Sequence, residues 1–241
     1  MNVNTEILKG KCAFISGATG GIGGAIALTL AKEGCNLFLT STDDNRLQKV
    51  IDECKKFGVQ VESCCGDLSI ETNIYNIINN VKEKFLGIDI LVNAAGIFPY
   101  EDLFDIDDKS YTKIMDINFK SAFLFTRIFS KYMTTKKWGR IINIGSSSAY
   151  SGFGGTSLYC ASKHALLGFS RAIHDELKGF NVRTYYISPS STKSRMGKAT
   201  KNQDFETFLD PDDIAKYVIF SISFDSNIMS EEIFLKRMQV R

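Results

Sequence analysis

Short apolar runs alternate with helix-length amphipathic segments along the whole chain. The runs have the length and continuous apolar character of buried strands, and they cover residues 11–16, 35–41, 59–65, 88–93, 140–145, 182–188 and 231–237. Helices are predicted between them, at 22–33, 44–57, 70–85, 107–136, 157–178 and 211–223. Apolar strands joined through helices are typical of a mainly parallel sheet with both faces covered. The order therefore predicts an α/β fold, doubly wound around about seven strands.

Length and composition fit a single domain over residues 1–241. The chain has 44% hydrophobic residues, and no linker, repeat or low-complexity tract divides it. A formal net charge of +2 without a long basic run argues against nucleic acid. No apolar stretch reaches the ~18 residues of a membrane span, and the start lacks the pattern of a secretory signal. The six cysteines and two histidines have no metal-ligand spacing. We expect a cytoplasmic protein with free thiols and no metal.

A glycine-rich turn, "SGATGGIGG", joins the first strand to the first helix. Glycine permits positive φ and close approach of a phosphate, whose charge the helix N-terminus favours. In a first βαβ unit this turn indicates a dinucleotide site. Two spacings can be counted, Gly17, Gly21 and Gly23 or Gly17, Gly20 and Gly23, and the turn alone leaves both open.

The end of the second strand bears on the choice of cofactor. NAD-binding proteins usually place an acidic residue there for the ribose hydroxyls, whereas this chain has Ser41 and Thr42. Asp43 and Asp44 come slightly late and are interpreted as caps of the next helix. Because two hydroxyls tolerate a 2′-phosphate that a carboxylate would repel, the sequence favours NADP(H) over NAD(H).

Tyr159 and Lys163 stand four residues apart on the predicted helix 157–178, so they share one face. A phenol titrates near ~10, and a neighbouring ammonium favours its ionised form. The pair therefore predicts a lowered pKa for Tyr159 and an acid/base role near neutrality.

Three further features accompany this pair. Ser146 lies 13 residues before Tyr159, "NAAG" at 93–96 follows the fourth strand, and Asn118 lies in the helix 107–136. Together with "SGATGGIG", this order resembles the short-chain dehydrogenase/reductase family across nearly the whole chain. The resemblance implies a Rossmann-like fold and selects Gly17, Gly21 and Gly23 as the functional glycines.

The resemblance implies a role for each matching position. Tyr159 exchanges a proton with the substrate oxygen, and Ser146 orients that oxygen. Lys163 lowers the tyrosine pKa and binds the nicotinamide ribose, while Asn118 holds a water that connects Lys163 to solvent. It also implies cofactor contacts at Gly17, Thr19, Gly21, Ile22, Gly23, Ser41, Thr42, Asp67, Leu68, Asn93, Ala94, Gly96, Tyr159, Lys163, Pro189 and Ser194.

The chain departs from the family after its sixth strand. Pro189 is followed by Ser190 instead of glycine, and Ser194 replaces a threonine that contacts the carboxamide of the nicotinamide. Residues 190–209 match the family's substrate lid and carry a group of cations, Lys193, Arg195, Lys198 and Lys201. The segment is either a solvated loop or a lid selective for anions.

The expected activity is an NAD(P)(H)-dependent interconversion of a ketone and a secondary alcohol by hydride transfer. The substrate is a small or carrier-bound carbonyl compound, with a 3-oxoacyl thioester among the candidates, although the C-terminus lacks the Asp-Gly-Gly tail of typical 3-oxoacyl reductases. Two alternatives stay open: an extended-type epimerase or dehydratase of a nucleotide sugar, and a non-catalytic dinucleotide sensor. The resemblance also implies a homodimer or homotetramer formed through 107–136 and 157–178.

Overall fold

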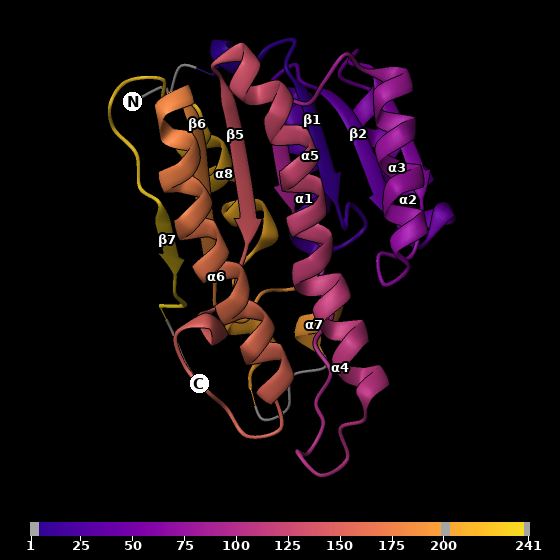
Figure 1. Ribbon diagram of the computed structural model, residues 1–241, viewed down its shortest axis with the longest axis vertical. Helices are drawn as coiled ribbons and strands as arrows, with labels where there is room; N and C mark the ends of the chain where they lie inside the picture. The colour runs from indigo at the N-terminus through magenta and orange to yellow at the C-terminus, as the bar shows by residue number, and fades with distance from the viewer. Residues whose placement is uncertain (1–4, 199–202, 239–241) are drawn as a thin grey trace.

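Seven parallel strands form one sheet at the centre of the molecule (Figure 1). The computed structural model describes residues 5–198 and 203–238. The strand order is β3-β2-β1-β4-β5-β6-β7. The strands are β1 (Cys12–Ser16), β2 (Asn36–Ser41), β3 (Val61–Cys65), β4 (Ile90–Asn93), β5 (Gly139–Ile144), β6 (Val182–Pro189) and β7 (Glu232–Leu235). The seven predicted strands are all present, and the sheet is entirely parallel.

Helices cover both faces of this sheet. The longer ones are α1 (Gly21–Lys32), α2 (Asp44–Lys55), α3 (Glu71–Lys84), α4 (Asp108–Met115), α5 (Ser121–Lys136), α6 (Ser157–Leu177) and α8 (Pro211–Ile222). One buried cluster joins α1, α2 and α8 to the sheet, and a second joins α3, α5 and α6 to its other face. Within the described ranges, no helix is both long enough and apolar enough to cross a membrane. The doubly wound arrangement is therefore confirmed.

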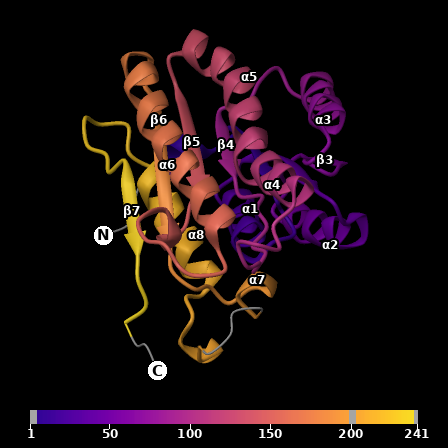
Figure 2. The same cartoon turned by 60° about the horizontal axis from the view of Figure 1, so that its bottom comes forward.

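The strand register aligns the carboxyl ends of three neighbouring strands. Ser16 of β1 is paired with Thr40 of β2 on one side and with Asn93 of β4 on the other. The chain order reverses at this point of the sheet, and ligands of doubly wound folds bind in the crevice that such a reversal opens. The short helix α7 (Arg195–Lys198) and α4 lie at the same end of the molecule (Figure 1), the end that is turned toward the viewer in Figure 2.

The predicted continuous helix over 107–136 is wrong in one respect. A π-helical turn over Asp116–Lys120 separates α4 from α5 and contains Asn118. Ser121, the first residue of α5, donates its hydroxyl to the carbonyl oxygen of Ile117 in this turn at 2.7 Å. An inserted residue of this kind redirects a side chain without ending the helix, and such turns occur frequently at functional sites.

Candidate cofactor and catalytic site

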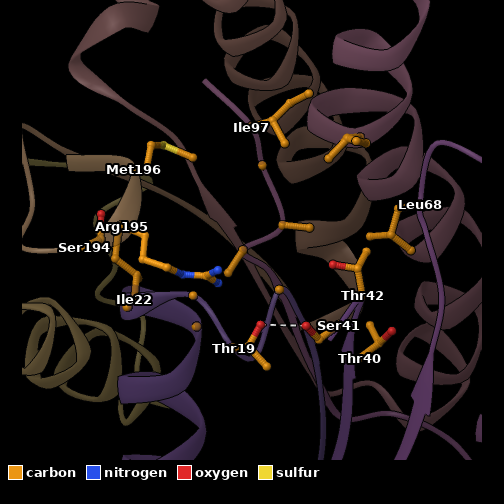
Figure 3. Close-up of a pocket in the computed structure, with 18 of the residues that line it drawn as sticks. Thr19, Ile22, Thr40, Ser41, Thr42, Leu68, Ile97, Ser194, Arg195 and Met196 are labelled. Atoms are coloured by element: carbon orange, nitrogen blue, oxygen red, sulfur yellow. Dashed lines mark hydrogen bonds between the residues drawn. The ribbon is translucent and has the colours of Figure 1, made fainter. Parts of the chain in front are cut away.

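A cavity of about 500 Å³ opens at the carboxyl ends of β1, β2 and β4 (Figure 3). Twelve of the predicted cofactor residues line it: Gly17, Thr19, Gly21, Ile22, Gly23, Ser41, Thr42, Asp67, Leu68, Ala94, Gly96 and Ser194. Residues from five different chain segments thus meet at one place. The volume lies in the range of cofactor and small-molecule sites.

The glycine turn forms the floor of the cavity, and two of its positions admit no side chain. Gly17 has φ +68°, and a Cβ there would lie 2.8 Å from the backbone of Ala95. A Cβ at Gly23 would overlap the carbonyl oxygen of Gly17. Gly20, by contrast, is the N-cap of α1 with an ordinary φ of −75°. Backbone amides and the N-terminus of α1 therefore face the cavity, as a bound phosphate requires.

Hydroxyl groups rather than acids line the cavity at the end of β2. The hydroxyls of Thr19 and Ser41 share a hydrogen bond of 2.6 Å (Figure 3). Thr42 lines the cavity beside them. Asp43 caps α2, since its carboxylate accepts the Arg46 N–H at 3.0 Å, which confirms the cap interpretation for this residue. Its carboxylate is thus engaged by the helix.

Asp67 lies at the far side of the cavity and also caps the segment that follows it. One carboxylate oxygen accepts the backbone N–H of Ser69 at 2.9 Å and its hydroxyl at 2.8 Å. These hydrogen bonds lower the pKa of Asp67, so the group is anionic at neutral pH. Asp67 therefore both caps the following segment and lines the cavity.

The other four predicted cofactor residues, Asn93, Tyr159, Lys163 and Pro189, are not among those that line the cavity, and their cofactor contacts stay a prediction. Asn93 is buried at the end of β4, where its Nδ2 donates to Oδ1 of Asn143 at 2.8 Å. Pro189 is the last residue of β6 and is paired with Leu235 of β7. Asn93 thus joins β4 to β5, and Pro189 lies at the end of the pairing between β6 and β7.

Tyr159 and Lys163 lie one turn apart on α6 and are both buried. The ammonium Nζ is 5.8 Å from the centroid of the Tyr159 ring and donates to the carbonyl oxygen of Ile144 at 2.9 Å. The Tyr159 hydroxyl is hydrogen-bonded to Ser146, and Phe98 packs edge-on against the tyrosine ring at 4.7 Å. The structure therefore brings the three predicted active-site residues together.

Burial controls the ionisation of this cluster. It raises the pKa of Tyr159, and the hydrogen bond with Ser146 opposes the shift only in part. Burial also lowers the pKa of Lys163 to about 8. The expected lowering of the Tyr159 pKa is thus wrong for the chain by itself, because helical spacing reports proximity but not desolvation. The phenol is protonated at neutral pH.

The π-helical turn aims Asn118 at the loop after β4. Its Oδ1 accepts the backbone N–H of Ile97 at 2.8 Å, and its Nδ2 donates to the Ile97 carbonyl at 3.0 Å and to the Ser162 hydroxyl at 3.1 Å. A Cβ at Gly96 would lie 3.4 Å from Asn118 Oδ1 and 3.7 Å from Lys163 Nζ. Asn118 therefore connects the cavity wall to the helix that carries Lys163.

Sequence reasoning missed Tyr186, which lies beneath the cluster. Its hydroxyl donates to the carbonyl oxygen of Lys163 at 3.1 Å and interacts with the backbone N–H of Ser146. Gly145 leaves room for this ring, because a Cβ there would overlap it. A tyrosine among the apolar residues of a buried strand gives no local signal of this role.

Comparisons with known proteins agree with this site. The family model described as short chain dehydrogenase matches residues 11–204. The Escherichia coli protein named "Uncharacterized oxidoreductase YgcW" is 35% identical over 197 residues, which are 81% of this chain and 74% of that protein. The 3-oxoacyl-[acyl-carrier-protein] reductase FabG of Rickettsia conorii is 32% identical over 225 residues, 90% of each chain.

A solved structure gives the same result. A metagenomic short-chain oxidoreductase in complex with NADP superimposes with a TM-score of 0.84 at 28% identity, over 96% of this chain and 99% of that one. Fold, family model and relatives thus agree on one assignment. The chain belongs to the short-chain dehydrogenase/reductase family, a family of oxidoreductases that bind a nicotinamide dinucleotide.

Proposed function

We propose that this chain interconverts a ketone and a secondary alcohol with NADP(H). The observation that carries the proposal is the buried Tyr159, hydrogen-bonded to Ser146 and one helical turn from Lys163, beside a cavity floored by the glycine turn. When bound, the nicotinamide dinucleotide supplies or accepts the hydride. The protein then has to align the carbonyl and move one proton.

The side chains of the cluster divide this task. Tyr159 is protonated at neutral pH and donates its proton to the carbonyl oxygen as negative charge develops there. Ser146 donates a hydrogen bond to the same oxygen. Lys163 holds a positive charge below about pH 8, which stabilises the phenolate that remains. Asn118 fixes the position of the cavity wall relative to α6 through its hydrogen bonds to Ile97 and Ser162.

The preference for NADP(H) rests on the end of β2. Ser41 and Thr42 supply two hydroxyls at the cavity, while Asp43 is outside the cavity wall and its carboxylate is paired with Arg46. A 2′-phosphate therefore meets hydrogen-bond partners there instead of a negative charge. The NADP complex of the metagenomic relative supports the same choice.

The substrate proposal is a carbonyl compound that is small or carried on a thioester. Relatives at about a third identity named as 3-oxoacyl-[acyl-carrier-protein] reductases support a 3-oxoacyl group. Residues 190–209 are proposed as the lid over this substrate. The homodimer or homotetramer expected from the family stays a prediction.

A carbonyl screen tests the proposal. The purified chain is mixed with NADPH or NADH and with 3-oxoacyl thioesters, sugar ketones and steroid-like ketones, and loss of the reduced nicotinamide is followed. We expect NADPH-dependent reduction of at least one class, absent in Tyr159→Phe. Binding without turnover across the panel would favour a dinucleotide sensor, and epimerisation of a nucleotide sugar would favour the extended type.

A further inference from the structure

The four cations expected on the lid have different surroundings. Lys193 pairs with Glu206 at 3.0 Å, and Lys198 lies 5.7 Å over the ring of Phe205. Lys201 falls outside the described residues. Arg195 alone of the described three lines the cavity, where its guanidinium extends toward the glycine turn (Figure 3). Of the three described lid cations, Arg195 is therefore the one placed to meet a ligand in the cavity.

The segment before Arg195 is packed directly on the glycine turn. A Cβ added at Gly21 would lie 3.2 Å from Cβ of Ser194 and 3.3 Å from the carbonyl oxygen of Lys193. The Ser194 hydroxyl accepts the backbone N–H of Gly197 at 3.0 Å, which fixes the start of α7. These contacts place the start of α7 beside the N-terminal end of α1, where Arg195 is exposed and also lines the cavity.

The electrostatics of this placement favour an anionic ligand. The N-terminus of α1 carries partial positive charge, and a guanidinium beside it adds to that charge. The cavity wall holds one carboxylate, Asp67, which is already hydrogen-bonded to Ser69. Within residues 5–198 and 203–238, Arg195 forms no ion pair. A ligand with two adjacent negative charges would reverse the repulsion.

We infer that Arg195 is a binding residue for the diphosphate of the dinucleotide. The inference rests on the proposed function, because it needs the cofactor in this cavity. Arg195 and the turn amides then hold the diphosphate from opposite sides, and its charges are matched by a fork of guanidinium donors. The lid cation therefore recognises the cofactor, and the anionic-substrate interpretation of Arg195 is set aside.

Calorimetric titration with ligand fragments tests this assignment. NADPH, NADH and ADP-ribose carry the diphosphate, whereas adenosine 2′-monophosphate carries only the ribose phosphate. We expect Arg195→Ala to lower the affinity for each diphosphate ligand about tenfold. Its affinity for adenosine 2′-monophosphate should stay within about twofold of the parent value. Arg195→Lys should recover part of the affinity. Lys198→Ala, a charge removed from the same helix but outside the cavity wall, should change none of them.

The possible outcomes separate this inference from the function on which it rests. If the unaltered protein binds no dinucleotide, the proposed function fails. If it binds NADPH and Arg195→Ala binds equally well, only the role of Arg195 is overturned. A loss of affinity confined to NADPH and adenosine 2′-monophosphate would assign Arg195 to the 2′-phosphate instead. A raised KM for anionic ketones with unchanged NADPH affinity would show that Arg195 binds the substrate and not the cofactor.

Discussion

The cofactor cavity and the catalytic cluster lie at the same end of the sheet but are built in opposite ways. The cavity floor depends on side chains that are absent, since Gly17 and Gly23 leave no room for a Cβ. The cluster depends on side chains that are present and removed from water, above all Tyr159 and Lys163. Substitutions in the cavity floor should therefore impair cofactor binding, and substitutions in the cluster should impair turnover. The two kinds of substitution should also change the free energy of unfolding differently.

Removing the Tyr159 hydroxyl gives the largest expected effect and tests this separation. In Tyr159→Phe the ring keeps its contact with Phe98, so the fold and cavity are retained. We expect kcat to fall at least about 1000-fold, since general acid catalysis is lost. The dissociation constant for NADPH should stay within about twofold. A parallel loss of NADPH affinity would mean that the two regions are not independent.

Gly23→Ala should damage the cavity instead of the cluster. The added methyl overlaps the carbonyl oxygen of Gly17, which is backbone and cannot turn away. We expect the free energy of unfolding to fall by about 3 kcal/mol and NADPH affinity to fall with it. Urea denaturation and calorimetry measure the two effects.

Gly168→Ala is the matched control for that substitution. Gly168 lies within α6, and a Cβ there would have no atom within 4 Å. The same change should therefore raise the free energy of unfolding by about 0.5–1 kcal/mol. If both variants were equally destabilised, the steric account of the glycine turn would be wrong.

Lys163→Met should make the protein more stable and inactive. Burial lowers the Lys163 pKa from 10.5 to about 8, so holding the ammonium in the folded state costs stability below pH 8. Stability should rise as pH increases from 8 to 10.5 in the parent chain, where the unfolded state still binds the proton. At pH 7 we expect the free energy of unfolding of the variant to be about 2 kcal/mol higher. This figure already subtracts the contribution of the lost hydrogen bond to Ile144.

The comparison of the two proteins across pH decides this point. The stability difference between Lys163→Met and the parent should shrink above pH 8 and reverse sign before pH 10.5, because the lost hydrogen bond to Ile144 remains when the charge cost is gone. A constant difference over this range would attribute the gain to packing rather than to the buried charge.

The smallest expected effect is a change of cofactor preference in Thr42→Asp. A carboxylate at this cavity position repels a 2′-phosphate but accepts ribose hydroxyls. We expect the ratio of NADPH to NADH affinity to fall about tenfold, with turnover by the preferred cofactor retained. Thr42→Asn serves as the uncharged control. An equal change for both cofactors would contradict the proposed contact.

Local pattern was sufficient for the strands and for most of the cavity wall. Apolar runs and the glycine spacing are short-range signals, and the carboxyl ends of parallel strands converge wherever such strands pair. The π-helical turn at Asn118 was not predicted, because one inserted residue barely disturbs helical periodicity.

The remaining differences have a common origin in three-dimensional packing. The raised pKa of Tyr159 and the place of Arg195 in the cavity wall depend on what surrounds each group after folding. Asn93 hydrogen-bonds to Asn143 on the neighbouring strand, a partner 50 residues away in the chain. The spacing of residues within one helix or strand does not show which residues from other elements will surround them after folding.

The contact between Gly145 and Tyr186 limits how this site can change by mutation. The ring of Tyr186 occupies the space that a side chain at position 145 would need, while its hydroxyl joins the segment of Ser146 to that of Lys163. Enlarging Gly145 alone creates overlap, and truncating Tyr186 alone leaves a void and frees two backbone groups. A larger residue at 145 and a smaller one at 186 should therefore offset each other's steric cost, so the effects of the two substitutions on stability are not additive.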